Sequence, residues 1–417
     1  MTNPETPKPR KRTRANGEGS IFPYRNGYAA YVWVTTPTGE KTKKWAYGKT
    51  REEVHDKYVK LLTEAKRGPV ATSVPTLDQY LTYWLAEVVV EPDFAPLTIS
   101  TYETLTRLYI RPELGRKRLD KLTVRDVRAW LNKARKTCQC CAQGKDARRP
   151  ADKQKCCAKG KCCEKTASER TVRDALTVLR SALSYAVSDE LISKNVAAGL
   201  RIPRPRKQRK AKPWSVEEAR QFLESARSGG DPLYAAYVLI LVLGLRKGEV
   251  LGLTWELVDL DSGELFVGEQ LQRVRRKLLR RRTKTEASEA GLPLPDICLT
   301  ALKLRKEHQE RDRVAHPDQW EDTGLVFTTR YGTPIEPRNF NRRFDYRIGQ
   351  AGVRRITVHG TRGTCATLLA ALDVHPRVAM RILRHSQISV TMEVYTEATD
   401  EATHEALKKL GSTLGTT

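Results

Sequence analysis

The chain has 417 residues, of which 75 are Lys or Arg and 49 are Asp or Glu, giving a formal net charge of +26. A chain of this length is too long for a single typical domain with one hydrophobic core, so we predict two or three domains. An excess of positive charge of this size favours a polyanionic partner, most commonly nucleic acid. A basic membrane-surface protein is the competing class, but no apolar run is long enough to span a bilayer and no signal-peptide pattern opens the chain, so we expect a cytoplasmic protein.

The first segment, residues 1–18, is rich in Pro, Lys and Arg and has almost no apolar side chains. Such a segment cannot bury a hydrophobic core, so we predict a disordered basic arm. A solubilising tail and an arm that follows DNA phosphates are both consistent with this composition.

Residues 19–68 have the pattern of three short strands followed by one helix. Asn26 followed by Gly27 predicts a tight turn, and Thr50 is placed to cap the helix. We predict a small α+β module with a basic sheet surface, which is either merely solvated or able to enter a DNA major groove. The basic side chains are Arg25, Lys41, Lys43 and Lys44.

After a short linker, residues 76–200 are predicted to be almost entirely helical, because apolar residues recur there at helical spacing. The longest helix is expected at residues 168–187. Its apolar stripe consists of Val172, Leu176, Leu179 and Leu183.

A cysteine-rich insertion at residues 137–165 interrupts this helical segment and holds most of the chain's nine cysteines. Clustered thiols in a cytoplasmic protein indicate metal or redox chemistry in preference to structural disulfides. Cys138 and Cys141 have zinc-ligand spacing, and Cys157 with Cys162 can supply a second pair. Lys and Arg surround these thiols and no histidine lies nearby, so a structural zinc site and a flexible thiol-rich loop stay equally open.

The linker at residues 201–212 is extended by its prolines and strongly cationic. A solvated spacer explains the prolines but accounts less well for the charge. We therefore expect this linker to cross a duplex backbone, where each neutralised phosphate strengthens binding through counterion release.

Residues 213–417 combine helices with a group of strands. Ser215 begins a capping-box pattern, and a very apolar helix over residues 233–243 ends at Gly244, a residue suited to a helix C-terminus. Residues 258–294 are predicted to form a meander of strands. Further helices are expected at residues 299–309 and 338–351.

Six side chains able to act on a phosphodiester follow one another along this last segment. A histidine and an arginine three apart on a helix lie on one face, where they can present a proton-transfer group and a guanidinium to the same phosphate. Each residue taken singly is more often structural than catalytic, and only the ordered set is persuasive. The six are Arg246, Lys284, His359, Arg362, His385 and Tyr395.

In this order the residues resemble the tyrosine site-specific recombinases of the phage integrase family, closely over the second half of the chain and more loosely over the first. Arg246 stands in the family's arginine box, and Lys284 matches its strand lysine. His359 and Arg362 form the HxxR motif, followed by the later histidine and the tyrosine nucleophile. Two positions depart from the pattern: Gly363, where histidine is commoner, and Arg384, where glycine is commoner.

The resemblance implies a mainly α fold with small β elements. It implies an arm-type DNA-binding domain at residues 19–68, a three-stranded sheet plus a helix. A helical core-binding domain at residues 76–200 follows, carrying the cysteine-rich insertion. A mixed α+β catalytic domain at residues 213–417 completes the chain.

The resemblance also implies a site-specific DNA recombinase that integrates or excises a phage or another mobile element. Tyr395 would attack a phosphodiester and form a 3′-phosphotyrosyl link, while Arg246 and Arg362 hold the non-bridging oxygens. Lys284 would protonate the 5′ leaving oxygen, His359 would be the general base and His385 a donor to the phosphate. The link conserves bond energy, so neither ATP nor a divalent metal is required, and no catalytic cofactor or metal ligand is expected.

The partners implied are double-stranded DNA attachment sites, three further copies of the chain in a tetramer on DNA, and accessory DNA-bending or excision factors, with the protein located at the nucleoid. A helix at residues 401–410 would tie the tetramer together. A type IB topoisomerase-like nicking-closing enzyme and a catalytically inactive DNA-binding regulator are the alternatives. Two DNA-reading domains argue against the first, and the full set of six residues argues against the second.

Overall fold

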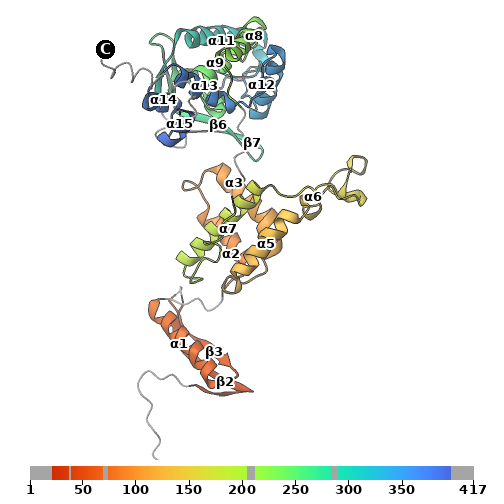
Figure 1. Cartoon of the computed structure of the whole chain (residues 1–417), viewed down its shortest axis with the longest axis vertical. Coiled ribbons are helices and arrows are strands. Elements are labelled where there is room, and N and C mark those ends of the chain that lie inside the picture. The colour runs from red at the N-terminus through yellow and green to blue at the C-terminus, as the bar shows by residue number, and fades with distance from the viewer. Residues whose placement is uncertain (1–20, 37–38, 69–73, 204–211, 283–289, 396–417) are drawn as a thin grey trace, which may run out of the picture. The chain divides into compact units, whose positions relative to one another are not determined.

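The computed structural model of the chain describes residues 21–36, 39–68, 74–203, 212–282 and 290–395 (Figure 1). Contacts divide the chain into two compact units, Met1–Pro205 and Arg206–Thr417. The basic arm, most of the linker, Lys284 and the helix expected at residues 401–410 lie outside the described residues. Within the described ranges, no helix combines the length and the apolar character that crossing a membrane requires.

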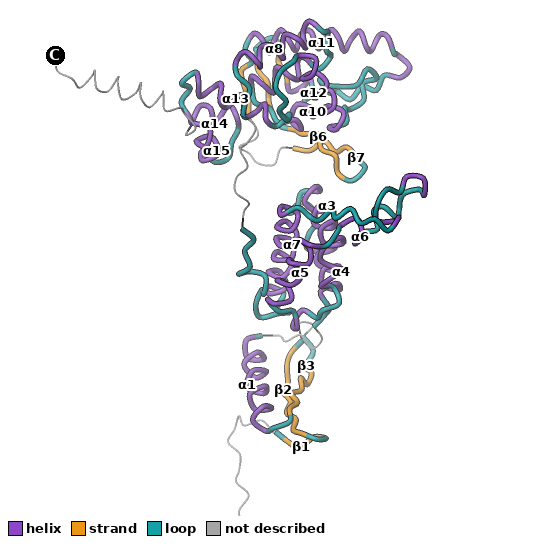
Figure 2. Tube along the Cα trace, turned by 45° about the vertical axis from the view of Figure 1, so that its right-hand side comes forward, coloured by secondary structure: helices purple, strands orange, loops and turns teal. Residues whose placement is uncertain are grey.

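The first module is a three-stranded antiparallel sheet with one helix packed against it, as the sequence predicts (Figure 2). Side chains of one sheet face, among them Ala30 and Val32, are buried against Tyr58 and Leu61 of the helix. Thr50 caps that helix, since its hydroxyl accepts the Glu53 N–H at 3.2 Å. The elements are β1 (Phe22–Tyr24), β2 (Gly27–Thr35), β3 (Lys41–Gly48) and α1 (Arg51–Arg67).

A bundle of helices follows, with a core formed around Trp84, Leu176 and Leu179. Capping boxes at Thr76 and Thr123 fix two of the helix starts. Single π-helical turns, η1 (Trp84–Val88) and η2 (Thr106–Ile110), continue α2 and α3. The helices are α2 (Leu77–Tyr83), α3 (Pro96–Leu105), α4 (Arg111–Leu114), α5 (Val124–Lys136) and α7 (Glu169–Ser188), with the 3₁₀ turn η3 (Leu119–Lys121) before α5.

The cysteine-rich insertion lies between α5 and α7 and contains only short helical turns. Its base is closed by a hydrogen bond from the Gln139 N–H to the Lys165 carbonyl at 2.9 Å. None of its residues belongs to the hydrophobic core of the bundle as described. The turns are α6 (Gln139–Ala142), η4 (Ala151–Lys153) and η5 (Cys157–Lys159).

The second unit is built around α9, whose residues are buried almost throughout because helices cover it on several sides. Phe222, Phe340 and Phe344 pack with Tyr237 of α9. Ser215 forms the predicted capping box with Glu218. The helices are α8 (Val216–Ser228), α9 (Tyr234–Val242), α10 (Lys247–Gly252), α11 (Asp296–Ala315), α12 (Pro337–Ala351), α13 (Gly360–Ala371), α14 (Pro376–Leu383) and α15 (Ile388–Tyr395), with 3₁₀ turns η6 (Trp255–Leu257) and η8 (Pro317–Gln319).

The strands expected over residues 258–294 are present, but the expected meander was wrong, because the strands divide between two sheets. The last strand pairs with β5 and skips the hairpin between them, so that Leu265 and Leu292 lie opposite each other in the core. Local alternation identifies strands but leaves their partners undetermined. The sheets are β4 (Val258–Asp259), β5 (Glu264–Val267) and β8 (Ala290–Pro293), and β6 (Glu269–Val274) with β7 (Lys277–Arg282).

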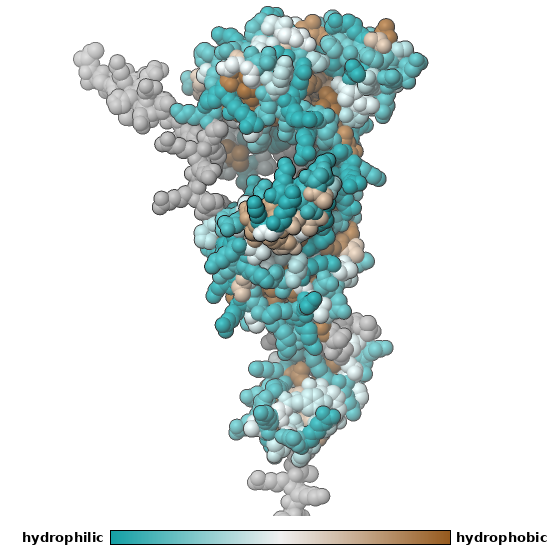
Figure 3. All heavy atoms as spheres, turned by 90° about the vertical axis from the view of Figure 1, so that its right-hand side faces the viewer, coloured by the Kyte–Doolittle hydropathy of each residue, from teal (hydrophilic) through white to brown (hydrophobic). Residues whose placement is uncertain are grey.

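Hydrophilic side chains cover most of the face shown in Figure 3. This surface is consistent with the large net positive charge of the chain.

Candidate active site

Segments that are far apart in the sequence supply the candidate site in the second unit. Gly244 ends the apolar helix α9 with a φ of 59°, a left-handed conformation that glycine adopts without steric cost. The chain turns there and places Arg246 directly before α10. His359 and Arg362 come from the start of α13, and Arg384 and His385 follow α14.

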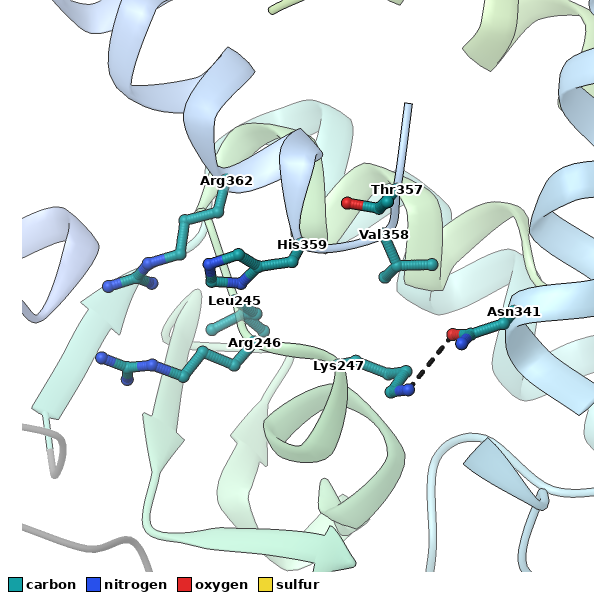
Figure 4. Close-up of a pocket in the computed structure, with 8 residues that line it drawn as sticks. All are labelled: Leu245, Arg246, Lys247, Asn341, Thr357, Val358, His359 and Arg362. Atoms are coloured by element: carbon teal, nitrogen blue, oxygen red, sulfur yellow. Dashed lines mark hydrogen bonds between the residues drawn. The ribbon is translucent and has the colours of Figure 1, made fainter. Parts of the chain in front are cut away.

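Arg246, His359 and Arg362 line one cavity of about 260 Å³. Figure 4 shows the two guanidinium groups lying beside each other and pointing the same way, with the His359 ring next to them. Lys247 points away from them and donates to Asn341 Oδ1 at 3.1 Å. The structure therefore brings three of the six predicted residues together.

Glu249 holds two of the arginines in place. Arg246 Nη1 donates to Glu249 Oε1 at 2.6 Å, and Arg384 Nη2 donates to Oε2 at 2.9 Å. The Glu249 side chain is 4 % exposed and that of Arg384 only 1 %. Burial raises the pKa of Glu249, but Arg384 and Arg246 outweigh it and hold the pKa below its ordinary value. Through these contacts Glu249 braces both arginines.

Arg362 is buried and has an unused donor. Its Nη1 donates to the Gly244 carbonyl oxygen, which ties α13 to the end of α9. Its buried Nη2 has no hydrogen-bond partner among the residues that the structure describes. Burial, with Arg246 and Arg384 nearby, lowers the pKa of Arg362 to about 9, so the side chain stays charged at neutral pH.

The cluster has an excess of positive charge. Three guanidinium groups, those of Arg246, Arg362 and Arg384, lie around one carboxylate, that of Glu249. Burial and the neighbouring guanidinium charges lower the pKa values of Arg362 and Arg384. A bound oxyanion would supply both the missing counter-charge and an acceptor for Arg362 Nη2. A phosphate group, with its several acceptor oxygens, fits this requirement.

Both candidate histidines are held in their neutral form. His359 lies immediately before the first residue of α13, and burial, Arg362 and Arg246 lower its pKa. Burial, Arg362 and Arg246 also lower the pKa of His385, to about 4, so this side chain is within reach of the same charges. His385 Nδ1 lies 2.9 Å from Thr391 Oγ1. If Nδ1 accepts a hydrogen bond from that hydroxyl, the ring proton of neutral His385 is on Nε2, which can then donate a hydrogen bond to an anion.

The structure does not bring Tyr395 to the cavity. Tyr395 is the last residue of α15, and its hydroxyl donates to the Val374 carbonyl oxygen at 2.6 Å. Burial raises the pKa of Tyr395. The phenol is thus protonated and occupied by a main-chain acceptor. Lys284 lies outside the described residues, two positions beyond the end of β7.

Arg384 is a site residue that the sequence reasoning treated only as a departure from pattern. Its φ is 51°, the left-handed conformation that favours glycine. An arginine at a position where glycine is common indicates a functional or structural contact of that side chain, because a contact has to compensate for the strained backbone. That contact is the buried pair with Glu249.

The sequence of this chain is similar to those of known integrases and recombinases. Residues 215–402 match the phage integrase family, and residues 76–134 match the N-terminal SAM-like domain of phage integrases. A tyrosine recombinase XerC-like protein of Caldanaerobacter subterraneus subsp. tengcongensis is 26 % identical over 409 residues, covering 93 % of this chain and 97 % of that protein. An integrase of Streptomyces ambofaciens is 27 % identical over 376 residues, covering 87 % of this chain and 88 % of that protein.

The fold is also similar to that of solved structures. The integrase of the Tn1549 transposon, in complex with a circular intermediate DNA, has a TM-score of 0.60 to this chain at 18 % identity. The similarity covers 81 % of this chain and all of that one. At this level of identity the comparison shows a shared fold.

Proposed function

From its membership of the phage integrase family, to which this chain belongs through both its catalytic and its SAM-like segments, we infer that the protein is a site-specific DNA recombinase. It cleaves and rejoins DNA strands through a 3′-phosphotyrosyl intermediate and so integrates or excises a mobile element. The chain is an enzyme of the tyrosine recombinase class.

The unpaired Nη2 of Arg362 is the observation that best supports phosphate chemistry at this site. It is buried beside Arg246 at a cavity with excess positive charge. A guanidinium fork matches phosphate geometry and keeps its charge, so the two arginines are suited to binding the non-bridging oxygens. Because Glu249 and the Gly244 carbonyl already fix both side chains, they stabilise developing charge without reorganising.

Each step of the reaction takes one proton from the attacking hydroxyl and gives one to the leaving oxygen. The Tyr395 oxygen forms a bond to phosphorus as His359, neutral at working pH, takes the phenolic proton. The bond from phosphorus to the 5′ oxygen breaks, and Lys284 gives that oxygen a proton. His385 donates a hydrogen bond to the phosphate. In the second step the 5′-hydroxyl of a partner strand attacks the phosphorus and gives its proton to Lys284. The bond from phosphorus to the Tyr395 oxygen breaks, and protonated His359 returns the phenolic proton. The phosphotyrosyl link conserves bond energy, so ATP is not consumed.

Tyr395 has to leave the Val374 carbonyl before it can react, since its hydroxyl is engaged there. Movement of α15 would release it toward the cavity of its own chain or of a neighbouring subunit. Binding of DNA is the natural trigger, because the phosphate then occupies the arginine cluster. Until that happens the raised pKa keeps the phenol unreactive.

Double-stranded DNA attachment sites are the proposed substrate, bound by a tetramer because exchange between two duplexes uses four active sites. The outer face of the β1–β3 sheet supports DNA contact in the first unit. Trp33 and Trp45 are exposed on it, and Lys43 Nζ lies 4.5 Å from the centre of the Tyr31 ring. Such a mixture of cations and aromatic rings suits contact with a phosphate backbone and bases. Accessory bending or excision factors and a nucleoid location complete the proposal.

Covalent trapping tests the function. A pool of nicked duplexes with randomised cores is incubated with the protein, and adducts are resolved on a denaturing gel and mapped. We expect a protein–DNA adduct that Tyr395→Phe abolishes and that Arg362→Lys slows by about 10²–10³-fold. Tyr346→Phe, at an exposed tyrosine of α12, is the matched control and should form the adduct normally.

An adduct that persists in Tyr395→Phe would overturn the assigned nucleophile. Intermolecular joining of two mapped duplexes then separates a recombinase from a topoisomerase-like enzyme, which relaxes DNA without joining partners. The absence of any adduct with the wild-type protein would support an inactive DNA-binding regulator instead.

A further inference from the structure

The seven thiols of the cysteine-rich insertion converge in space. They form two groups of four, and within each group all the Sγ atoms lie within 4.8 Å of one another. Cys157 belongs to both groups. The first group is Cys138, Cys141, Cys157 and Cys162, and the second is Cys140, Cys156, Cys157 and Cys163.

The spacing of the sulfur atoms matches tetrahedral coordination. A tetrahedron with zinc–sulfur bonds of about 2.3 Å has sulfur–sulfur edges of about 3.8 Å. In the first group, Cys141 and Cys162 are separated by 3.7 Å, and Cys138 and Cys157 by 3.9 Å. In the second group, Cys157 lies 3.8 Å from Cys163. The remaining second-group contact, between Cys140 and Cys156, is 3.9 Å.

Disulfide bonding does not account for this arrangement. All seven cysteines are free thiols, and the sulfur–sulfur distances are almost twice the length of a disulfide bond, about 2.05 Å. Seven thiols cannot pair completely, and each of the two groups gathers four sulfurs where a disulfide needs two.

The insertion lacks a hydrophobic core that could hold this shape. Between Cys138 and Lys165 its only aliphatic side chains are alanines, so it cannot form a hydrophobic core. Polar contacts organise the turn before the second cysteine pair, where buried Asp146 accepts the N–H groups of Cys156 at 2.9 Å and Ala158 at 3.1 Å. This turn presents Cys156 and Cys157 to the other thiols.

The charge of the surrounding residues also suits two metal ions. Seven thiolates around two divalent cations leave a net charge of −3. From Cys138 to Lys165 the chain carries eight Lys or Arg against three Asp or Glu. The basic residues that argue against a simple zinc site in the sequence therefore balance the negative charge of a dinuclear one.

We propose that the insertion folds around two structural zinc ions, each bound by four thiolates, with Cys157 as the thiolate that both ions share. We assign zinc because closed four-thiolate sites without an open position are typical of structural zinc, and the metal analysis below distinguishes it from iron, which binds the same ligands. Metal binding supplies the folding free energy that the insertion's own side chains do not.

Metal analysis of the full-length protein is the first test. Protein purified without chelators should contain two zinc ions per chain by plasma mass spectrometry. After exchange with ¹¹³Cd, the NMR spectrum should show two resonances in the thiolate region, split by coupling through the shared sulfur. One metal per chain or none, iron in place of zinc, or two uncoupled resonances would each overturn the proposal.

Single substitutions then locate the shared ligand, with zinc measured after dialysis against EDTA. Cys141→Ser and Cys140→Ser should each lose one of the two ions, because each removes a ligand from one group. Cys157→Ser should lose both. Cys298→Ala, at a buried cysteine of the second unit, is the control and should retain two. Loss of only one ion from Cys157→Ser would show that the sites do not share this residue.

Discussion

The carboxylate of Glu249 binds one arginine that is close to it in the sequence and another that is far from it. It binds Arg246, three positions earlier, and Arg384, which is 135 positions later. A buried carboxylate between two guanidinium groups is stable only while both partners are present, because an unpaired buried charge is very costly. Glu249 thus fixes the direction of Arg246 toward the cavity and offsets the backbone strain at Arg384.

Replacing Glu249 by Gln should destabilise the second unit by about 3–5 kcal/mol, because Arg384 then stays buried without a counter-charge. Differential scanning calorimetry of the full chain should show a lower midpoint for one transition, and covalent adduct formation should slow. Glu224→Gln is the control, since the pair of Glu224 with Arg227 is exposed, and it should cost less than about 1 kcal/mol. Equal midpoints for the two variants would contradict the role of Glu249.

The histidines of the site predict a pH dependence of stability. His385 has a folded-state pKa of about 4, below its ordinary value of 6.5, so the unfolded chain takes up this proton first as the pH falls. The stability that neutral His385 contributes is complete above pH 6.5 and declines as the pH falls toward 4. Calorimetric midpoints between pH 7.5 and 5 should fall less steeply in His385→Gln. The exposed His55→Gln should keep the wild-type slope, and an unchanged slope in His385→Gln would count against this assignment.

At the scale of elements, the end of α9 is where the site is assembled. A side-chain Cβ at Gly244 would lie 2.6 Å from Leu383 Cδ2 and 3.3 Å from Cys365 Sγ. Residues of α13 and α14 therefore pack directly on the glycine backbone. Close packing at this one point aligns the chain segments that carry Arg246, Arg362 and Arg384.

Gly244→Ala should reduce both stability and adduct formation, because the new methyl group meets Leu383 and the positive φ is unfavourable for alanine. The loss of adduct should exceed tenfold, since Arg362 is hydrogen-bonded to the Gly244 carbonyl. Gly349→Ala is the matched control: it lies in α12 with open space around its Cβ, and it should stabilise by roughly 1 kcal/mol. Calorimetry and the trapping assay measure both effects, and a fully active Gly244→Ala would refute the packing argument.

At the scale of the whole molecule, the net charge of +26 favours contact with DNA over a large area. Basic residues are exposed in both units, including Lys43 on β3 and Lys277 at the start of β7. Protein contacts to phosphate release condensed counterions, so the strength of binding depends on salt in proportion to the number of contacts.

Binding to a non-cognate duplex should therefore weaken steeply with salt. We expect a slope of log K against log salt of about −5 or steeper, from fluorescence anisotropy between 50 and 200 mM salt. Lys43→Gln should reduce this slope by about 1 if the sheet face contacts a phosphate. A wild-type slope shallower than about −2 would exclude an extended basic interface.

Features that depend on neighbouring residues could be predicted from the order of amino acids. Thr50 and Ser215 cap helices as predicted because a cap needs only the next few residues. The apolar period located α7, which buries one face, and the continuous apolar run located α9, which is buried almost throughout. The ordered motifs pointed to the phage integrase family, whose model matches residues 215–402.

Tertiary structure alone decided what meets across long separations. It placed Arg246 beside Arg362, paired β8 with β5, joined Arg384 to Glu249 and bound the Tyr395 hydroxyl to Val374. It also gathered seven thiols into two groups that share Cys157, where spacing suggested one site at most. Such contacts arise when segments that are distant in the sequence pack against one another. A local pattern of residues does not specify which distant segment it will contact.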